Sequence, residues 1–270
     1  MKTQQKSVHK KLIRALVIVL LLLAILAGAF FWYVSDYYRA EDVALEVLAQ
    51  NDGIITQDNL TILSPSYQSN TAIIFYPGAK VEAEAYLPLL DQIRQTGITC
   101  ILVDMPFHMA IFDSDAAEDV MTQFPEIEHW YLAGHSMGGA IASELAKLYP
   151  DVIKKMVLWA PAFNLPDALH YLTGQVERAK TYDHGGYEIS DDFVEDILKR
   201  DFYQELDTYQ NDLLVIHGTK DTTVPYEISN KYMKLFHKGT KFISIEDGNH
   251  NFDKLSDIKQ VLKLTLDFFE

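Results

Sequence analysis

From Thr71 onward, short apolar runs alternate with longer amphipathic stretches, and this alternation constrains the possible folds more than any other feature. The runs are continuously apolar, which is typical of parallel strands covered by helices on both faces. The sequence therefore predicts an α/β domain over residues 67–270, with a mostly parallel sheet. The expected strands are 72–76, 98–104, 130–133, 156–160, 213–217 and 242–245, and the expected helices are 83–95, 138–148, 227–236 and 255–269.

Two segments depart from this alternation. Residues 163–211 contain no clear strand, although a helix is expected at 191–199. We interpret this segment as a lid-like insertion over a pocket, with a plain surface crossover as the alternative. Residues 35–66 precede the alternating region and are expected to form a connector, in which the apolar residues of 41–48 have helical spacing.

The N-terminal part of the chain contains a long apolar stretch. Residues 15–34 carry no charge, and as a helix they would be roughly 30 Å long, enough to cross the hydrocarbon core of a bilayer. Basic residues precede the stretch and Asp36 follows it, so 1–14 should be cytoplasmic and the large domain extracytoplasmic. We expect a single-pass signal anchor in the cell membrane. A signal peptide cleaved near Ala27-Gly28-Ala29 is the alternative, which the apolar residues 30–34 disfavour.

The charge of the chain argues against nucleic acid as a partner. The net charge is −15, and because residues 1–34 hold five basic and no acidic side chains, the rest of the chain carries −20. An acidic body repels nucleic acid and anionic lipid. The single cysteine, Cys100, lies in an apolar run and is expected to be a small buried side chain.

Ser136 is the candidate nucleophile. It lies in Gly134-His135-Ser136-Met137-Gly138, a Gly-x-Ser-x-Gly pattern between an expected strand and an expected helix. The pattern alone is weak, but a sharp strand-to-helix turn at this place would expose the serine hydroxyl at the strand tip. The start of the helix favours negative charge nearby.

Two later loops supply the acid and the base that a serine nucleophile needs. Asp221 follows the expected strand 213–217, and His250 follows 242–245, so both lie past the carboxyl ends of strands, where sites in α/β sheets are built. The order Ser136, Asp221, His250 is the order of an α/β triad. His217 is a weaker candidate base because it lies within a strand, and His135 is interpreted as a packing or orienting residue.

Backbone N–H groups should stabilise the oxyanion of the reaction. We expect one from Met137, directly after the nucleophile, and one from Ala79, in the loop that contains Pro77-Gly78. Phe107 and Met109 follow a strand tip on the same edge and are candidates to line an acyl pocket, with ordinary core packing as the alternative. The nine histidines form no metal-ligand pattern and no nucleotide-binding loop is present, so neither a metal nor a cofactor is expected.

Five stretches together resemble the α/β-hydrolase superfamily over residues 71–270, and more narrowly the small bacterial "alpha/beta hydrolase family 5" group. They are 75–81, 86–90, 104–110, 133–140 and 218–221. The resemblance implies an α/β-hydrolase fold and esterase-type activity. One departure is Pro77-Gly78, where many members of the wider superfamily have His-Gly.

These observations predict a membrane-anchored serine hydrolase that cleaves a small-molecule ester by a carboxylesterase-type, acyl-enzyme mechanism. An acyl transferase or a peptidase with the same triad is the alternative within enzymes, since only the acceptor and leaving group differ. A catalytically idle surface binding module is the alternative outside enzymes, because fold alone does not assign function.

Overall fold

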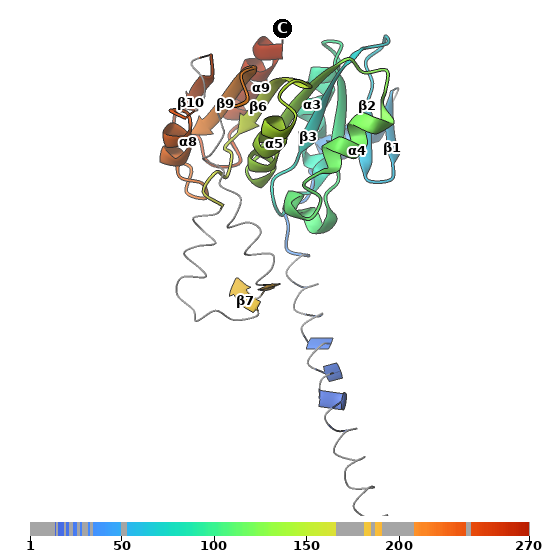
Figure 1. Ribbon diagram of the computed structural model, residues 1–270, viewed down its shortest axis with the longest axis vertical. Helices are drawn as coiled ribbons and strands as arrows, with labels where there is room; N and C mark the ends of the chain where they lie inside the picture. Colours follow the sequence, from blue (N-terminus) through green and yellow to red (C-terminus); the bar gives the residue numbers. More distant parts are fainter. Residues whose placement is uncertain are drawn as a thin grey trace, which may run out of the picture.

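The computed structural model describes residues 35–49, 53–165, 181–184, 187–190, 208–235 and 239–269, and single residues or short stretches between 14 and 32. Its centre is an eight-stranded sheet in the order β1-β2-β4-β3-β5-β6-β9-β10 (Figure 1). All neighbours from β4 to β10 are parallel, whereas β1 and β2 pair antiparallel with each other and β2 with β4. The strands are β1 (Ile54–Gln57), β2 (Leu60–Leu63), β3 (Thr71–Tyr76), β4 (Thr99–Val103), β5 (His129–His135), β6 (Ile153–Trp159), β9 (Asp212–Gly218) and β10 (Lys241–Ile245).

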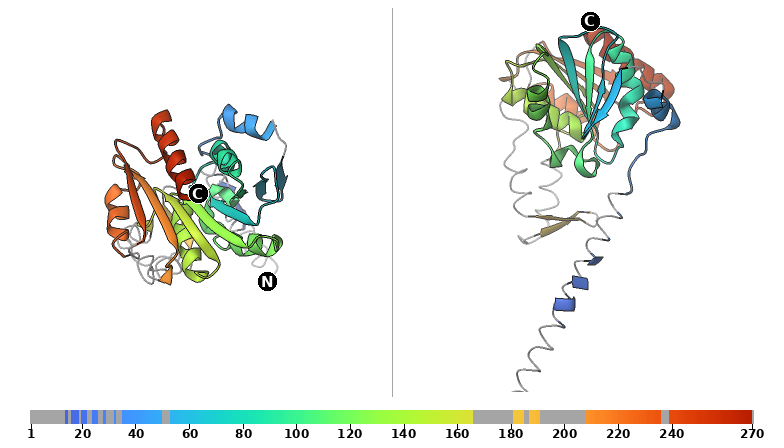
Figure 2. Two further views of the ribbon diagram at one scale, coloured as in Figure 1. Left: turned by 90° about the horizontal axis from the view of Figure 1, so that it is seen from above. Right: turned by 90° about the vertical axis from the view of Figure 1, so that its right-hand side faces the viewer.

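Helices cover both faces of the sheet, as Figure 2 shows from above. The helices are α2 (Asp42–Ala49), α3 (Leu87–Arg94), α4 (Ala116–Gln123), α5 (Met137–Leu148), α8 (Tyr226–Tyr232) and α9 (Leu255–Phe269). Alternate residues of each central strand enter opposite cores: Ile74 packs in the core with α4, α5 and α8, and Ile73 in the core with α2, α3 and α9. Both cores are apolar, which explains why the strands are apolar without interruption. The predicted α/β-hydrolase fold, with its mostly parallel sheet, is confirmed.

All six predicted strands are present, but the sheet also contains two strands that the sequence analysis did not predict. β1 and β2 lie in 35–66, the segment expected to be a connector, and extend the sheet at one edge. Their four-residue length leaves too few positions for a periodic pattern. The eight-residue helix α4 was also not predicted.

The insertion at 163–211 also differs from the prediction, because it is not free of strands. β7 (Thr181–His184) and β8 (Tyr187–Ser190) form an antiparallel hairpin. In the sequence, Gly185-Gly186 stands between the two strands, and this pair favours two-residue hairpin turns. The helix expected at 191–199 lies outside the described residues, and the lid role stays a prediction.

Most of the predicted anchor, residues 15–34, also lies outside the described part of the chain. Among the residues that the structure describes, no helix is both long enough and apolar enough to span a membrane. The described residues between 14 and 32 are helical and exposed, with Leu16, Leu21, Ile25 and Trp32 among them.

Candidate active site

Ser136 lies on a sharp turn between β5, which ends at His135, and α5, which begins at Met137. Its backbone has φ 53° and ψ −121°, a conformation that a residue with a side chain adopts only under strain. Two backbone hydrogen bonds to the segment at the end of β6 hold it: Ser136 N–H donates to Trp159 O at 2.9 Å, and Ala162 N–H donates to Ser136 O at 2.9 Å. The strained turn presents the half-buried serine hydroxyl beyond the strand tip.

The two glycines of the Gly-x-Ser-x-Gly pattern allow this turn to pack tightly. A Cβ atom on Gly138 would lie 2.2 Å from Tyr76 O and 2.3 Å from Pro77 O, and one on Gly134 would lie 2.5 Å from Gly138 O. Real side chains do not come so close to backbone oxygens. The start of α5 therefore sits directly against the end of β3, which places the loop after β3 beside the serine.

His250 connects the serine to the acid. Its Nε2 atom lies 2.8 Å from Ser136 Oγ, and its Nδ1 atom lies 2.7 Å from Asp221 Oδ2. A carboxylate accepts only, so Nδ1 carries the hydrogen and Nε2 of the neutral ring is left to accept the serine proton. The structure thus brings together the three residues predicted as a triad, although 85 residues separate the first from the second in sequence.

Asp221 is held by more hydrogen bonds than a triad requires. Its Oδ1 accepts from the N–H groups of Thr223 and Val224, both at 2.8 Å, and its Oδ2 accepts from His217 as well as from His250. Burial by itself would raise the pKa of Asp221, but the hydrogen bonds from both histidines and the charge of His250 outweigh it and lower the pKa well below its usual range. Asp221 is therefore an anion throughout the neutral range.

The sequence analysis considered His217 only as a weaker candidate base and did not identify its contact with Asp221. It is fully buried, and its Nε2 lies 3.0 Å from Asp221 Oδ2 and 2.9 Å from Val224 O. Both are acceptors, so Nε2 must carry a hydrogen, while Nδ1 meets Ser229 Oγ at 2.7 Å. His217 consequently orients the acid and has no geometry of a base toward Ser136. Its four-residue spacing from Asp221, across the end of a strand, was the available signal.

His135 connects the loop of the base to the loop after β3, which refines its expected orienting role. Its Nε2 lies 3.0 Å from the carbonyl oxygen of His250, and its Nδ1 lies 2.8 Å from Tyr86 Oη. Burial first, and then the nearby His250, lower the pKa of His135 to about 3, so the ring is neutral at pH 7. Nε2–H then donates to His250 O, and Nδ1 accepts from the Tyr86 hydroxyl. The sequence analysis did not identify Tyr86.

The two predicted oxyanion donors lie on adjacent backbones. Gly78 N–H donates to Tyr86 Oη at 3.1 Å and is thus engaged, which favours its neighbour Ala79 as the donor from this loop. Met137 is the first residue of α5, where backbone N–H groups point out of the helix. Their role in binding an oxyanion stays a prediction.

The two predicted pocket residues lie after β4, on the same edge of the sheet as the triad. Phe107 is 45% exposed and has φ 55°, and its ring meets Phe112 edge to face at 5.7 Å between centroids. Met109 is half-buried. The structure leaves their contact with a substrate as a prediction.

The described residues contain neither a cluster of metal ligands nor an accessible thiol. Within the described ranges, no group of three or more His, Cys, Asp or Glu side chains is arranged to hold a metal ion. Cys100 is fully buried in β4, its thiol pKa is raised by that burial, and its Sγ lies 3.4 Å from Leu90 O. The polar groups at the strand tips suit acyl transfer to a serine.

Comparison with known proteins agrees with this architecture. A model of the alpha/beta hydrolase family matches residues 72–175. Est1E from Butyrivibrio proteoclasticus superposes with a TM-score of 0.70 at 21% identity, over 81% of this chain and 98% of that one. The monoacylglycerol lipase of Paleococcus ferrophilus gives 0.61 at 16% identity, over 77% and 96%.

A third solved structure, the esterase domain of a Rhodothermus marinus protein, gives a TM-score of 0.60 at 18% identity, over 77% of this chain and 90% of that one. Identities this low show a shared fold and nothing finer. The chain therefore has an α/β-hydrolase fold, and its residues 72–175 match the alpha/beta hydrolase family model.

Proposed function

We propose that the protein is a serine hydrolase that cleaves carboxylic esters through an acyl-enzyme. The observation that carries the proposal is the unbroken hydrogen-bonded line from Ser136 Oγ through His250 to Asp221, with distances of 2.8 and 2.7 Å. A nucleophile, a base and an orienting anion are the complete requirement for activating a serine. The esterase and lipase among the structures of similar fold are consistent with this chemistry.

The reaction follows from the geometry. Ser136 Oγ attacks the ester carbonyl carbon while its proton passes to His250 Nε2, and the Asp221 carboxylate stabilises the imidazolium that forms. The tetrahedral intermediate collapses, the C–O bond to the alcohol breaks, and His250 returns the proton to the leaving oxygen. A water molecule then gives a proton to His250 and attacks the acyl carbon. The second tetrahedral intermediate collapses, the bond between the acyl carbon and Ser136 Oγ breaks, and His250 returns the proton to Oγ, which releases the acid and restores Ser136.

The negative charge of both intermediates needs donors that are in place beforehand. The Met137 and Ala79 N–H groups fill this role in the proposal. Support comes from the close packing of Gly138 against Tyr76 and Pro77, which joins the two donor segments with no room for a side chain between them.

We further propose that residues 15–34 anchor the protein in the cell membrane, with residues 1–14 in the cytoplasm and the catalytic domain outside. The apolar stretch has the length of a membrane span and basic residues only on its N-terminal side. The large apolar side chains described there are exposed, Trp32 at 75%, and such side chains are stable in contact with lipid.

Hydrolysis of p-nitrophenyl esters of graded chain length by the full-length protein tests the hydrolase proposal. Ser136→Ala should lower the rate by roughly 10³-fold or more. Ser143→Ala is the matched control, because Ser143 lies one helical turn or more away on α5 and donates only to Ala140 O in the same helix. The proposal would be overturned if no ester were hydrolysed, or if Ser136→Ala retained full activity.

A further inference from the structure

The chain that leaves the apolar N-terminal stretch is docked on the catalytic domain from its first residues. Tyr38 N–H donates to Lys80 O and Glu82 N–H donates to Tyr38 O, both at 2.8 Å, so Tyr38 pairs with Val81 like a strand residue. Ala40 N–H donates to the Glu82 carboxylate at 2.6 Å. We call residues 35–40 the stem. These contacts fix the point at which the chain joins the domain.

Two side chains of the stem add to this attachment. Lys80 Nζ lies 3.1 Å from an Asp36 carboxylate oxygen, and the ring of Tyr37 lies 4.1 Å from the ring of His108. Lys80 N–H in turn donates to His108 O at 2.8 Å. The stem is thereby joined both to the loop after β3 and to the loop after β4.

Those loops belong to the catalytic edge of the sheet. Lys80 directly follows Ala79, the proposed oxyanion donor, and the end of β3 pairs with the end of β5 at Tyr76 and Gly134. The C-terminal helix α9 starts at this edge, shortly after His250, and its end contacts Lys155 near the start of β6. In Figure 1 the C-terminus accordingly lies at the top of the domain, and the stem lies at the bottom.

The distance between the apolar stretch and the site is short. Tyr38 is the fourth residue after Val34, and a fully extended chain of that length spans about 14 Å. A membrane anchor that ends at Val34 therefore holds the catalytic edge close to the bilayer surface. It also limits rotation, because Tyr38 is paired on the domain.

The surface next to the stem has the chemistry of a membrane interface. Tyr38, Phe107 and Phe112 are 67%, 45% and 46% exposed, and aromatic side chains are favoured at the level of lipid headgroups. Charges of both signs lie on this edge, since Asp36 pairs with Lys80, Arg39 lies over the Tyr37 ring, and the side chain of Asp104 is 57% exposed. The net charge of −20 on the chain after residue 34 disfavours an anionic lipid or substrate.

We propose that the stem holds the Ser136 edge of the sheet against the membrane, so that the enzyme takes from the bilayer an ester of an uncharged or zwitterionic amphiphile. The proposal rests on the anchor and on the ester hydrolysis proposed above. Its experiment separates the orientation of the domain from its activity.

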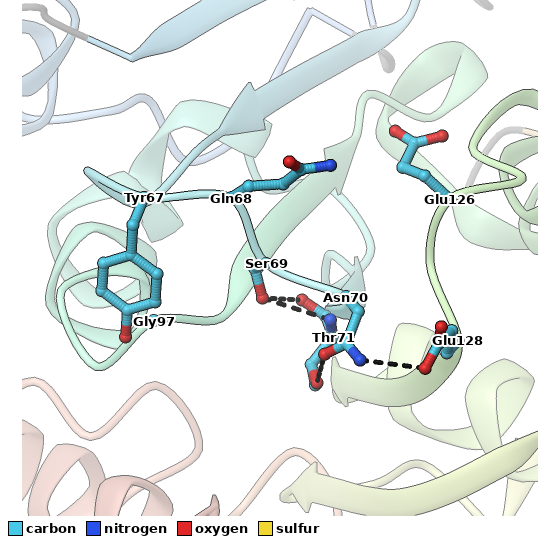
Figure 3. A pocket seen from close by; sticks show the side chains of 8 residues that line it. All are labelled: Tyr67, Gln68, Ser69, Asn70, Thr71, Gly97, Glu126 and Glu128. Carbon is cyan, nitrogen blue, oxygen red and sulfur yellow. Dashed lines mark hydrogen bonds between the residues drawn. The ribbon is translucent and has the colours of Figure 1, made fainter.

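The opposite edge of the sheet provides the control position. Figure 3 shows a polar cavity there, with Glu126 and Glu128 on one side and Tyr67 on the other, and Asn70 donating to Glu128 at 3.0 Å. These residues precede β3 and β5, and the six residues of β3 separate the two edges by roughly 20 Å.

The full-length protein is reconstituted in phosphatidylcholine vesicles that contain a nitroxide-labelled lipid. A fluorophore is attached to Phe112→Cys or to Glu126→Cys; the single native cysteine, Cys100, is fully buried, so labelling at the surface is selective. We expect quenching at position 112 to be at least about twofold stronger than at 126. Insertion of about ten Gly and Ser residues after Val34 should make the quenching at positions 112 and 126 similar, because the domain would no longer be held in one orientation.

Hydrolysis of 1-oleoylglycerol in the vesicles is compared with hydrolysis of soluble p-nitrophenyl acetate. The same insertion should lower the first rate several-fold and leave the second unchanged. Equal quenching at 112 and 126, or stronger quenching at 126, would overturn the orientation even if Ser136-dependent hydrolysis persists. Asymmetric quenching without hydrolysis of either ester would retain the orientation and overturn the proposed function.

Discussion

The catalytic edge of the sheet has two halves that are built in opposite ways. In the half formed by the ends of β5, β9 and β10, the polar side chains are buried and each nitrogen of His217, His250 and His135 meets a partner. In the half formed by residues 105–113, aromatic rings are exposed, and His108 Nδ1 has no hydrogen-bond partner in the described part of the chain. The first half holds the proposed catalytic groups in place, and the second half exposes aromatic side chains at the surface.

This difference between the two halves predicts which substitutions should most affect activity and stability. A buried, fully satisfied polar network loses much when one member is removed, because the remaining groups are left unpaired. An exposed aromatic pair contributes little to the stability of the domain, since water replaces most of what is lost. Four substitutions test this contrast.

Asp221→Asn should have the largest effect. The amide would present an N–H to His250 Nδ1, so the imidazole would take the wrong tautomer, and kcat should fall by roughly 10⁴-fold with the fold intact. Asp247→Asn is the control, because Asp247 is an exposed carboxylate on the neighbouring loop, paired with Lys220. A fall of less than tenfold in ester hydrolysis by Asp221→Asn would contradict the assigned role of the acid.

Acidification should weaken the protein through His135. Its folded pKa of about 3 lies below the ordinary value of 6.5, so between these pH values the unfolded chain binds a proton that the folded chain does not. The neutral His135 ring therefore contributes its full stability above pH 6.5. At pH 5 the free energy of unfolding should be about 2 kcal/mol lower than above pH 6.5 because of this group.

Urea unfolding of the wild type and of His135→Asn at pH 7 and pH 5 measures this contribution. The variant should be less stable at pH 7, where it loses contacts to Tyr86 and His250, but it should lose less stability between the two pH values. An equal loss in both proteins would show that His135 is not the group responsible.

His217→Leu should lower kcat by about 10-fold, since a buried partner that only orients an active residue has effects of this order. Removal of one donor leaves more negative charge on Asp221 Oδ2, which favours a positive charge on the facing imidazole and should move the acid limb of kcat/KM to higher pH. His217→Gln keeps an N–H at the position of Nε2 and should restore most of both properties. Reduced stability with an unmoved pH profile would leave His217 a purely structural role.

Phe112→Ser should have the smallest effect on the folded domain. Its ring is 46% exposed, so we expect the free energy of unfolding to change by about 1 kcal/mol or less. Phe75→Ser is the contrasting variant, because Phe75 is fully buried between Tyr86 and Trp159. It should lower the free energy of unfolding several times more than Phe112→Ser does. Similar unfolding midpoints for the two variants in urea would remove the distinction between the halves.

The α/β architecture and the positions of the three proposed catalytic residues could be predicted from the amino-acid sequence alone. The strands could be predicted because both of their faces are buried, which makes each a continuous apolar run. Ser136, Asp221 and His250 could be predicted because each lies just past a strand, and the carboxyl ends of parallel strands share one edge of the sheet.

Only the tertiary structure showed what surrounds those residues. Three features could not be predicted from local sequence: the roles of His217 and Tyr86, the addition of β1 and β2 to the sheet, and the docking of the stem on Lys80 and Glu82. All three depend on groups distant in sequence or on the direction of a side chain at a turn. Local sequence patterns report hydrophobic periodicity and turn-forming residues, and long-range contacts change neither of them. Packing decides which nitrogen meets which oxygen, and therefore how the triad is held.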